Sequence, residues 1–149
     1  WRSWSRARST TVTTSTSLFY SATSGWTQCS VANGELGLTG CCASPVPSAC
    51  NVPWTLDTAL NRTGNLASWQ TGTITLQAIR TELQAGHPVG ARIAWSGGGG
   101  HFVIIEGCDD DGVLAIEDPA NGATSVDITT FTSSYLGSGS WTHTYITQP

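Results

Sequence analysis

Near Pro88 the hydrophobic period of this sequence changes from that of a helix to that of a strand, and this change constrains the fold most. Apolar residues within 76–83 fall on one helical stripe, which Thr75 precedes and Gly86 follows. In residues 89–96, apolar side chains alternate with small or polar ones, which is the pattern of a strand with one buried face. We therefore predict a helix that leads directly into a strand.

Further strand signals follow at short intervals. Four glycines, 97–100, separate the first strand from an apolar run at 101–105, and Asp111-Gly112 is a hairpin signal before a second apolar run at 113–116. A last strand is predicted over 141–146. The second half of the chain should therefore form an antiparallel sheet.

The first half of the chain has helix signals instead. Thr27 is placed to cap a helix over 28–36, and Gly37 stands just past its end. Asn51 is placed to cap a second helix that runs through Pro53, an allowed first-turn proline. We assign the buried face of that second helix to Trp54, Leu56, Ala59 and Leu60. A helical first half and an antiparallel sheet in the second half make an α+β domain.

Length and charge indicate one compact domain that binds neither nucleic acid nor membranes. A chain of 149 residues has room for one sizeable core, and 39% hydrophobic with 11% charged residues excludes a disordered chain. The net charge is −4, and three of the six cationic residues lie in the first eight positions, so the rest lacks the basic stripe that phosphate binding needs. No run approaches the roughly 18 apolar residues of a membrane-spanning helix. We expect a monomer without cofactor or metal.

The amino end differs from the rest of the chain. Residues 1–17 are rich in arginine and then almost continuous in serine and threonine, without the apolar period of a core element. The chain starts with Trp1 and contains no methionine, so we take it to be a processed product or a fragment. We predict an atypical segment over 1–17, disordered or altered in sequence, and the folded domain over 18–149.

Four of the five cysteines fall in one short window. Two local disulfides are the natural interpretation. Because the adjacent Cys41 and Cys42 rarely bridge each other, their partners are Cys29 and Cys50 in one order or the other. A zinc site is the alternative, but the window has no histidine and no C-x-x-C spacing. Disulfides indicate a secreted protein, in which Asn61-Arg62-Thr63 would be a glycosylation sequon if the host glycosylates.

His101 and Asp118 are the strongest candidates for chemistry. His101 follows the glycine tract and opens an apolar strand, which anchors its side chain on a rigid element. If residues 109–112 form the hairpin tip, Asp118 lies on the neighbouring strand at the same end as His101. A carboxylate there could accept a hydrogen bond from one imidazole nitrogen and leave the other nitrogen free to act as a base. The alternative is a packed histidine at a strand edge and a turn-forming Asp before proline.

Other motifs are weaker candidates. We interpret His87 and His143 as structural or solvated, and Cys108 as a packed thiol. The acidic residues of 109–112 lack the later glutamate of a calcium loop, so we predict a turn. The glycines at 97–100 are not a phosphate loop, because no Lys-Ser/Thr follows them.

Several stretches together resemble a known group: residues 86–107, the pair Asp118-Pro119, and the segments 26–29, 32–33, 41–42 and 50–54, which lie in and around the cysteine window. They resemble secreted bacterial papain-like cysteine peptidases, which are related to a plant-pathogen effector protease and similar in layout to bacteriocin-processing peptidases. The resemblance spans residues 18–141. It implies a helical half that carries the nucleophile and a sheet half that carries His101 and Asp118. It also implies disulfides for the four clustered cysteines.

The nucleophile motif of that group is not matched. The group has Trp-Cys-Trp-Ala-Ala at the start of its first long helix, with an oxyanion-stabilising Gln slightly upstream. Alignment without gaps puts Arg8 at the cysteine, whereas alignment on Trp4 puts Ser5 there, and no Gln precedes either. Neither residue supplies the thiolate that a Cys-His pair relies on. Cys29 is a further candidate because it begins a predicted helix, where the dipole lowers a thiol pKa, although a disulfide would occupy it.

The sequence thus predicts a secreted papain-like cysteine peptidase domain that acts on peptides or proteins by a Cys-His-Asp mechanism. The chain as printed should be inactive, because the nucleophile and the oxyanion Gln are absent. One alternative is a non-catalytic module on the same scaffold that binds peptide or cell wall. The other is a cell-wall amidase of the related Cys-His type, which would differ in substrate.

Overall fold

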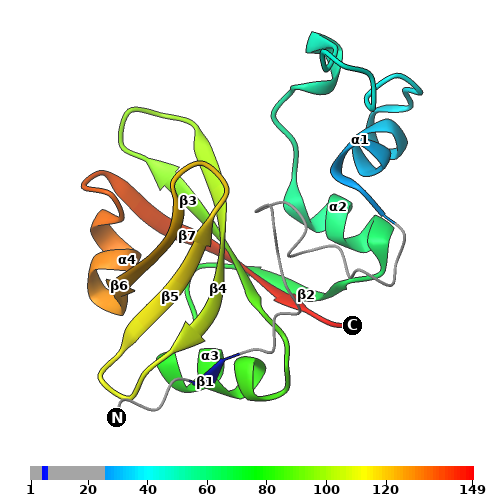
Figure 1. Ribbon diagram of the computed structural model, residues 1–149. Coiled ribbons are helices and arrows are strands. Elements are labelled where there is room, and N and C mark those ends of the chain that lie inside the picture. Colours follow the sequence, from blue (N-terminus) through cyan, green and yellow to red (C-terminus); the bar gives the residue numbers. More distant parts are fainter. Residues whose placement is uncertain (1–4, 7–25) are drawn as a thin grey trace.

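The computed structural model describes residues 5–6 and 26–149 and has the predicted α+β architecture (Figure 1). Its helices are α1 (Gln28–Leu36), the 3₁₀ helix η2 (Ser48–Cys50), α2 (Leu56–Thr63), α3 (Leu76–Gln84) and α4 (Ile128–Ser134). Its strands are β1 (Ser5–Arg6), β2 (Leu66–Thr71), β3 (Val89–Trp95), β4 (Gly100–Cys108), β5 (Val113–Asp118), β6 (Gly122–Asp127) and β7 (Gly139–Thr147). The predicted boundary between residues 17 and 18 lies outside the described residues.

The strands form one antiparallel sheet in the order β2-β7-β3-β4-β5-β6. The short β1 also pairs with β4, at Gly107 and Cys108, beyond the point where β3 begins. The last strand does not stay at an edge but lies between β2 and β3. The predicted antiparallel sheet is confirmed, and the turn over residues 109–112 joins β4 to β5 as expected.

The main core lies between one face of the sheet and the helices α3 and α4. Ile79 and Leu83 of α3 and Phe131 of α4 are buried against strand residues that include Val89 and Ile93. Fully burying one such side chain contributes roughly 1.5–3 kcal/mol to folding. The alternation predicted for β3 therefore has the expected cause, because one face of the strand packs into this core.

The first and third predicted helices begin where their capping residues stand. The Thr27 hydroxyl accepts a hydrogen bond from the Ser30 amide, and the Ser30 hydroxyl accepts one from the Thr27 amide, so both satisfy donors that α1 leaves unpaired. Gly37 follows α1 with a φ of 66°, a left-handed conformation that glycine adopts without strain. Thr75 caps α3 in the same way by accepting from the Ala78 amide.

The predicted start of the second helix is wrong. Asn51 ends η2 instead, and α2 begins five residues later at Leu56. Pro53 disfavours helical dihedrals in the residue before it, which keeps this segment out of the helix. Trp54 is correspondingly not part of a buried helix face. Its side chain is 47% exposed, and its indole N–H donates to a Glu35 carboxylate oxygen at 2.7 Å.

Five elements have no counterpart in the sequence analysis: the two-residue β1, the 3₁₀ helix η2, the edge strands β2 and β6, and the short helix α4. Among the residues that the structure describes, β2 and β6 are each paired on one side only, and both are mostly exposed. In α4 the apolar residues Ile128 and Phe131 stand among threonines and serines, and Asp127 caps the helix by accepting from the Thr129 and Thr130 amides.

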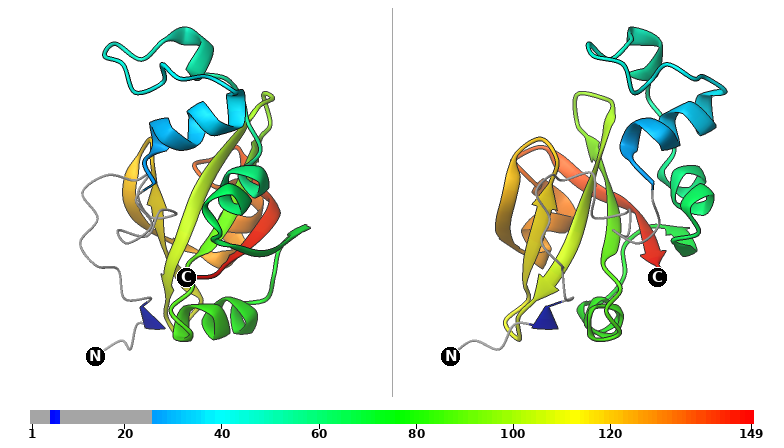
Figure 2. Two further views of the ribbon diagram at one scale, coloured as in Figure 1. Left: turned by 90° about the vertical axis from the view of Figure 1, so that its right-hand side faces the viewer. Right: turned by 45° about the vertical axis from the view of Figure 1, so that its right-hand side comes forward.

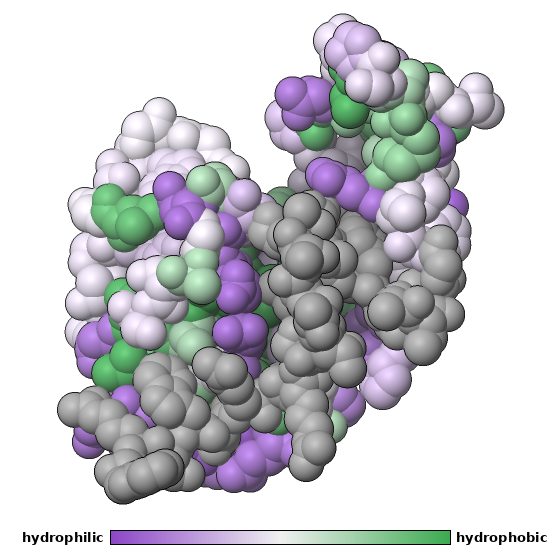
Figure 3. Space-filling model, viewed as in Figure 1, coloured by the Kyte–Doolittle hydropathy of each residue, from purple (hydrophilic) through white to green (hydrophobic). Residues whose placement is uncertain are grey.

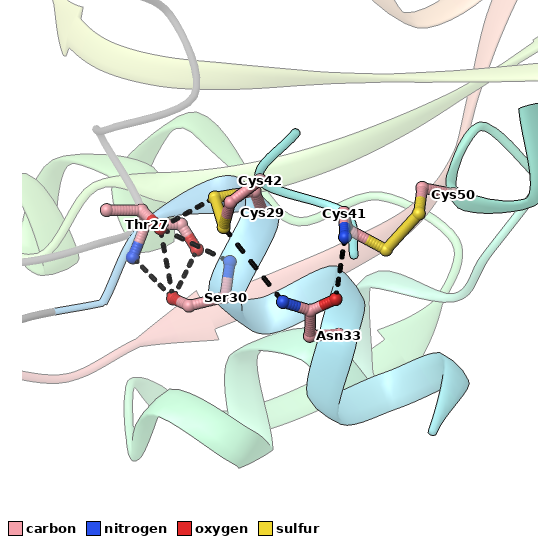
Figure 4. Close-up of a disulfide and its surroundings, with 7 residues drawn as sticks. All are labelled: Thr27, Cys29, Ser30, Asn33, Cys41, Cys42 and Cys50. Atoms are coloured by element: carbon pink, nitrogen blue, oxygen red, sulfur yellow. Dashed lines mark hydrogen bonds between the residues drawn. A yellow bond between two sulfur atoms is a disulfide. The ribbon is translucent and has the colours of Figure 1, made fainter. Parts of the chain in front are cut away.

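The segment around α1 is stapled by two disulfides, Cys29–Cys42 and Cys41–Cys50. These bonds confirm that the clustered cysteines are oxidised, and they leave none of the four sulfurs as a thiolate to hold zinc. Asn33 supports the staple because its side-chain oxygen accepts from the Cys41 amide at 2.9 Å (Figure 4). Two bonds that close short loops compensate for the small apolar core of this segment.

The stapled segment, residues 26–55, stands apart from the sheet. Figure 2 shows α1 and the loop after it across from the turn that joins β3 to β4. α1 contacts α2 and η2, while α2 contacts β2 and β7 and so joins the segment to the sheet. None of the described helices has the length and apolar character needed to cross a membrane.

Candidate active site

His101 and Asp118 meet at one end of the β4–β5 pair. His101 is the second residue of β4 and pairs with Ile93, while Asp118 is the last residue of β5. The register joins Ile104 to Glu117, so Asp118 lies diagonally across from His101 on the same face of the sheet. The predicted contact is present, with His101 Nε2 lying 2.7 Å from Asp118 Oδ1.

Asp118 is a fully buried carboxylate whose two oxygens are both saturated with donors. Oδ1 accepts from the backbone amides of Ala120 and Asn121 at 2.8 and 3.1 Å in addition to His101. Oδ2 accepts from the side-chain amide of Asn121 at 3.0 Å and from the Tyr135 hydroxyl at 2.8 Å. Burial alone would raise the pKa of Asp118, but these hydrogen bonds hold that pKa at about 2. Asp118 therefore carries a full charge at neutral pH.

The imidazole of His101 is held by this carboxylate and by an aromatic ring. Because Oδ1 of Asp118 only accepts, Nε2 carries the proton, and a neutral imidazole has its lone pair on Nδ1. The indole of Trp95 stacks on the imidazole with a centroid separation of 6.0 Å and an interplanar angle of 23°. The His101 side chain is 20% exposed. This arrangement has the features of a general base with one nitrogen oriented and the other available.

Sequence reasoning missed three of the neighbours that hold this pair. Asn121 follows Asp118-Pro119 at turn spacing, and the general tendency of Asp to bond backbone amides two and three residues on could have identified it. Trp95 and Tyr135 had no comparable signal. Trp95 was assigned only to the buried face of a strand, and Tyr135 lies in a turn after a helix that was not predicted.

None of the cysteines lies ready to act with His101. Cys29 is bonded to Cys42 at the start of α1, so its sulfur is not a thiolate. Cys108 is buried at the opposite end of β4, seven positions from His101 and thus roughly 23 Å away along the strand. Burial raises the pKa of the Cys108 thiol, which keeps it protonated.

Of the two residues that the alignments put at the nucleophile position, the structure describes only Ser5, and Ser5 is not brought to His101. The backbone of Ser5 pairs with Cys108, at the far end of β4. Arg8 lies outside the described residues.

The remaining sequence candidates occupy other sites. His87 Nδ1 lies 3.4 Å from a Glu82 carboxylate oxygen after α3. His143 bonds the Thr142 hydroxyl, and its ring stacks on Trp69. Oδ1 of Asp109 accepts from the amides of residues 111 and 113, as a turn residue does. Among the described residues, no three His, Cys, Asp or Glu side chains cluster in a way that could hold a metal ion.

The surface is hollowed between the sheet and the stapled segment. Figure 3 shows an open notch at the upper side of the molecule, with the sheet on one side and the stapled segment on the other. The turn between β3 and β4, next to His101, stands on the sheet side of this notch (Figure 1). Another hollow, between α1 and α2, is lined by Trp26, Glu35, Thr58, Asn61 and Arg62.

Comparison with known proteins adds one match. A family model described as the papain-like cysteine protease AvrRpt2 matches residues 56–136, which include His101 and Asp118. A search of curated proteins gives no match.

Proposed function

Because the chain belongs to the family of the papain-like cysteine protease AvrRpt2, we propose that His101 and Asp118 are the base half of a cysteine peptidase site. The observation that carries this proposal is the 2.7 Å bond from His101 Nε2 to a buried, charged carboxylate. Such a bond sets the tautomer and orientation of an imidazole and stabilises its protonated form.

In a site of this kind that has its cysteine, as an intact relative does, Nδ1 of His101 takes the proton of the cysteine thiol, and the thiolate attacks the carbonyl carbon of a peptide bond. The imidazolium then gives this proton to the leaving amine as the C–N bond breaks, and the acyl group remains on sulfur. Water releases the acyl group with His101 again acting as base. Asp118 accepts from Nε2 throughout these steps.

We propose further that residues 1–149 by themselves hydrolyse peptides very slowly or not at all. Four of the five sulfurs are in disulfides, and the fifth is buried at the far end of β4. The aligned positions hold Arg8 or Ser5 instead of cysteine. The two disulfides also support the proposal that the protein works outside the reducing cytosol, as a secreted protein does.

The first experiment is a peptide-hydrolysis assay on this chain, combined with alkylation by iodoacetamide under native conditions. We expect no turnover and no alkylated sulfur. Turnover that both His101→Ala and Cys29→Ala abolish would overturn the proposed inactivity and would identify Cys29 as the nucleophile.

A second experiment tests the base half without a thiol. An accessible imidazole attacks the activated ester p-nitrophenyl acetate, and we expect His101→Ala to remove a measurable part of this reaction. His87→Ala is the matched control, because His87 also faces a carboxylate and is similarly exposed. If His101→Ala changes the rate no more than the His87→Ala control does, His101 is not an available base and the proposed site is wrong.

The occupied sulfurs also favour a second candidate function, a binding module that keeps the peptidase scaffold. The stapled segment contains one charged residue, Glu35, and the guanidinium of Arg62 is paired with its carboxylate. The side of the notch that the stapled segment forms therefore carries few charges. Saturable binding of a peptide or of murein fragments without any turnover would support this function, and the absence of binding to both would exclude it.

A further inference from the structure

Tyr135 contacts the His101–Asp118 pair by two separate routes. Its hydroxyl donates to Asp118 Oδ2 at 2.8 Å, and its ring stacks on Trp95 with a centroid separation of 6.4 Å and an interplanar angle of 23°. Trp95 in turn stacks on His101. The four side chains therefore form a closed ring of contacts, in which Tyr135 lies opposite His101.

The polar route controls the plane of the carboxylate. Rotation about the last side-chain torsion of an aspartate is soft, so its oxygens need partners to keep one orientation. On the Oδ2 side, those partners are the Asn121 amide and the Tyr135 hydroxyl. Burial, followed by the hydrogen bond to Asp118 and the charge of that carboxylate, raises the pKa of Tyr135, so the hydroxyl keeps its proton and remains a donor.

The backbone around Tyr135 is built to hold this side chain in place. The Tyr135 and Gly139 amides and carbonyls exchange two hydrogen bonds of 2.8 Å. The next residue, Leu136, has a φ of 48°, a left-handed conformation that costs a non-glycine residue free energy. Leu136 is itself exposed, so its own packing does not repay this cost. The turn instead directs Tyr135 inward, where its ring also contacts Phe131 edge-on at 5.3 Å.

We propose that Tyr135 is a positioning residue of the site, which fixes the carboxylate of Asp118 through its hydroxyl and supports the imidazole of His101 through Trp95. This proposal rests on the proposed function for its catalytic meaning. The effect of Tyr135 on the orientation of Asp118 and His101 can be measured without any hydrolysis.

The test is the variant Tyr135→Phe, which removes the hydroxyl and keeps the ring. The pKa of Asp118, followed by its carboxyl carbon resonance, should rise by about 1 unit, which is the size expected when a charged acceptor loses one donor. The His101 Nε2–H resonance should also shift or broaden, because the carboxylate that accepts its hydrogen bond is no longer held in one orientation. Tyr145→Phe is the matched control, since Tyr145 is equally buried and packs on Trp69 and Phe102.

A merely structural role predicts a different outcome. The melting temperature would fall in Tyr135→Phe, while the Asp118 pKa and the His101 resonance would stay as they are in the control, and this result would overturn the proposal. If Tyr135→Phe does not fold, the proposal is tested on the unsubstituted protein. The Tyr135 hydroxyl proton should exchange slowly with water, and its resonance should shift as Asp118 titrates. A rapidly exchanging hydroxyl proton would overturn the proposal. If the ester assay shows no role for His101 while the Asp118, His101 and Tyr135 resonances behave as expected, only the proposed function is wrong, and the positioning role of Tyr135 stands.

Discussion

Acid should destabilise this fold through Asp118, and the structure gives the size of the effect. An aspartate has an ordinary pKa of 3.8, whereas hydrogen bonding lowers the pKa of the buried Asp118 to about 2. The folded state therefore binds this proton less readily than the unfolded state does. The difference stabilises the fold by about 2.5 kcal/mol when the carboxyl is ionised in both states.

The sign and the pH range of the effect follow from the same two values. The contribution is fully present above the unfolded pKa of 3.8 and is lost as the pH falls through the folded pKa of about 2. Between pH 5 and pH 2 the unfolding free energy should fall by about 2 kcal/mol on account of Asp118.

Asp118→Asn provides the reference for this measurement. Urea unfolding at a series of pH values, with disulfides intact, gives the unfolding free energy of both proteins. Other carboxylates contribute equally to both curves; they include Glu35, whose lowered pKa reflects hydrogen bonds from Trp54 and Arg62 that outweigh burial. The original protein should lose about 2 kcal/mol more than the variant does from pH 5 to pH 2. Parallel curves would refute the inference that Asp118 is a strongly stabilised carboxylate.

Two further predictions concern the stapled segment and the aromatic contacts beside the site. Reduction of Cys29–Cys42 and Cys41–Cys50 should remove about 2–3 kcal/mol per bond from the stapled segment, so limited proteolysis should cut within residues 37–55 while amide exchange in the sheet stays slow. Gly139→Ala should lower the unfolding free energy by about 1–3 kcal/mol, because its new methyl would lie 2.5 Å from Ile93 Cγ2 and 2.7 Å from Trp95 Cζ3. Gly40→Ala is the control in open space, and an equal effect of both glycine substitutions on urea unfolding would contradict this reasoning.

The second prediction also bears on the candidate site. Trp95 and Gly139 are paired across β3 and β7, and the missing side chain of Gly139 makes room for the indole that stacks on His101. A methyl group at this position would displace the indole, since the Tyr135 carbonyl on the other side is fixed backbone. The packing of β7 and the orientation of His101 are therefore coupled.

Local patterns in the sequence were sufficient to predict the helices that local capping stabilises and the strands whose buried residues alternate regularly. Capping residues and helical spacing predicted α1 and α3, and alternation predicted β3. The turn at 109–112 placed Asp118 near His101, because an antiparallel hairpin brings together residues at similar distances from its tip. The cysteine count predicted two disulfides but left their pairing open, since adjacent cysteines satisfy either order.

The elements that were missed or misplaced depend on contacts far along the chain. The exposed strand β2 owes its existence to pairing with β7, more than seventy positions away, and its own residues have no buried alternation. In α4 the threonines and serines are poor helix formers, so burial of Phe131 in the core supports the helix. The start of α2 was misplaced because the prediction gave more weight to a capping residue at 51 and an allowed first-turn proline at 53. In the structure, the preference for an extended conformation before proline decides, and the helix begins later.

From the sequence alone, then, follow the α+β class and the antiparallel hairpin that joins His101 to Asp118, and the family resemblance adds the prediction that no cysteine stands at the nucleophile position. These properties depend on spacing along the chain, which short-range geometry converts directly into structure. The tertiary structure alone decided the disulfide pairing, the distance of Cys108 and Ser5 from His101, and the approach of Tyr135 to Asp118. These depend on which strands pair and how helices pack on them, and long-range packing leaves no periodic signal in the sequence.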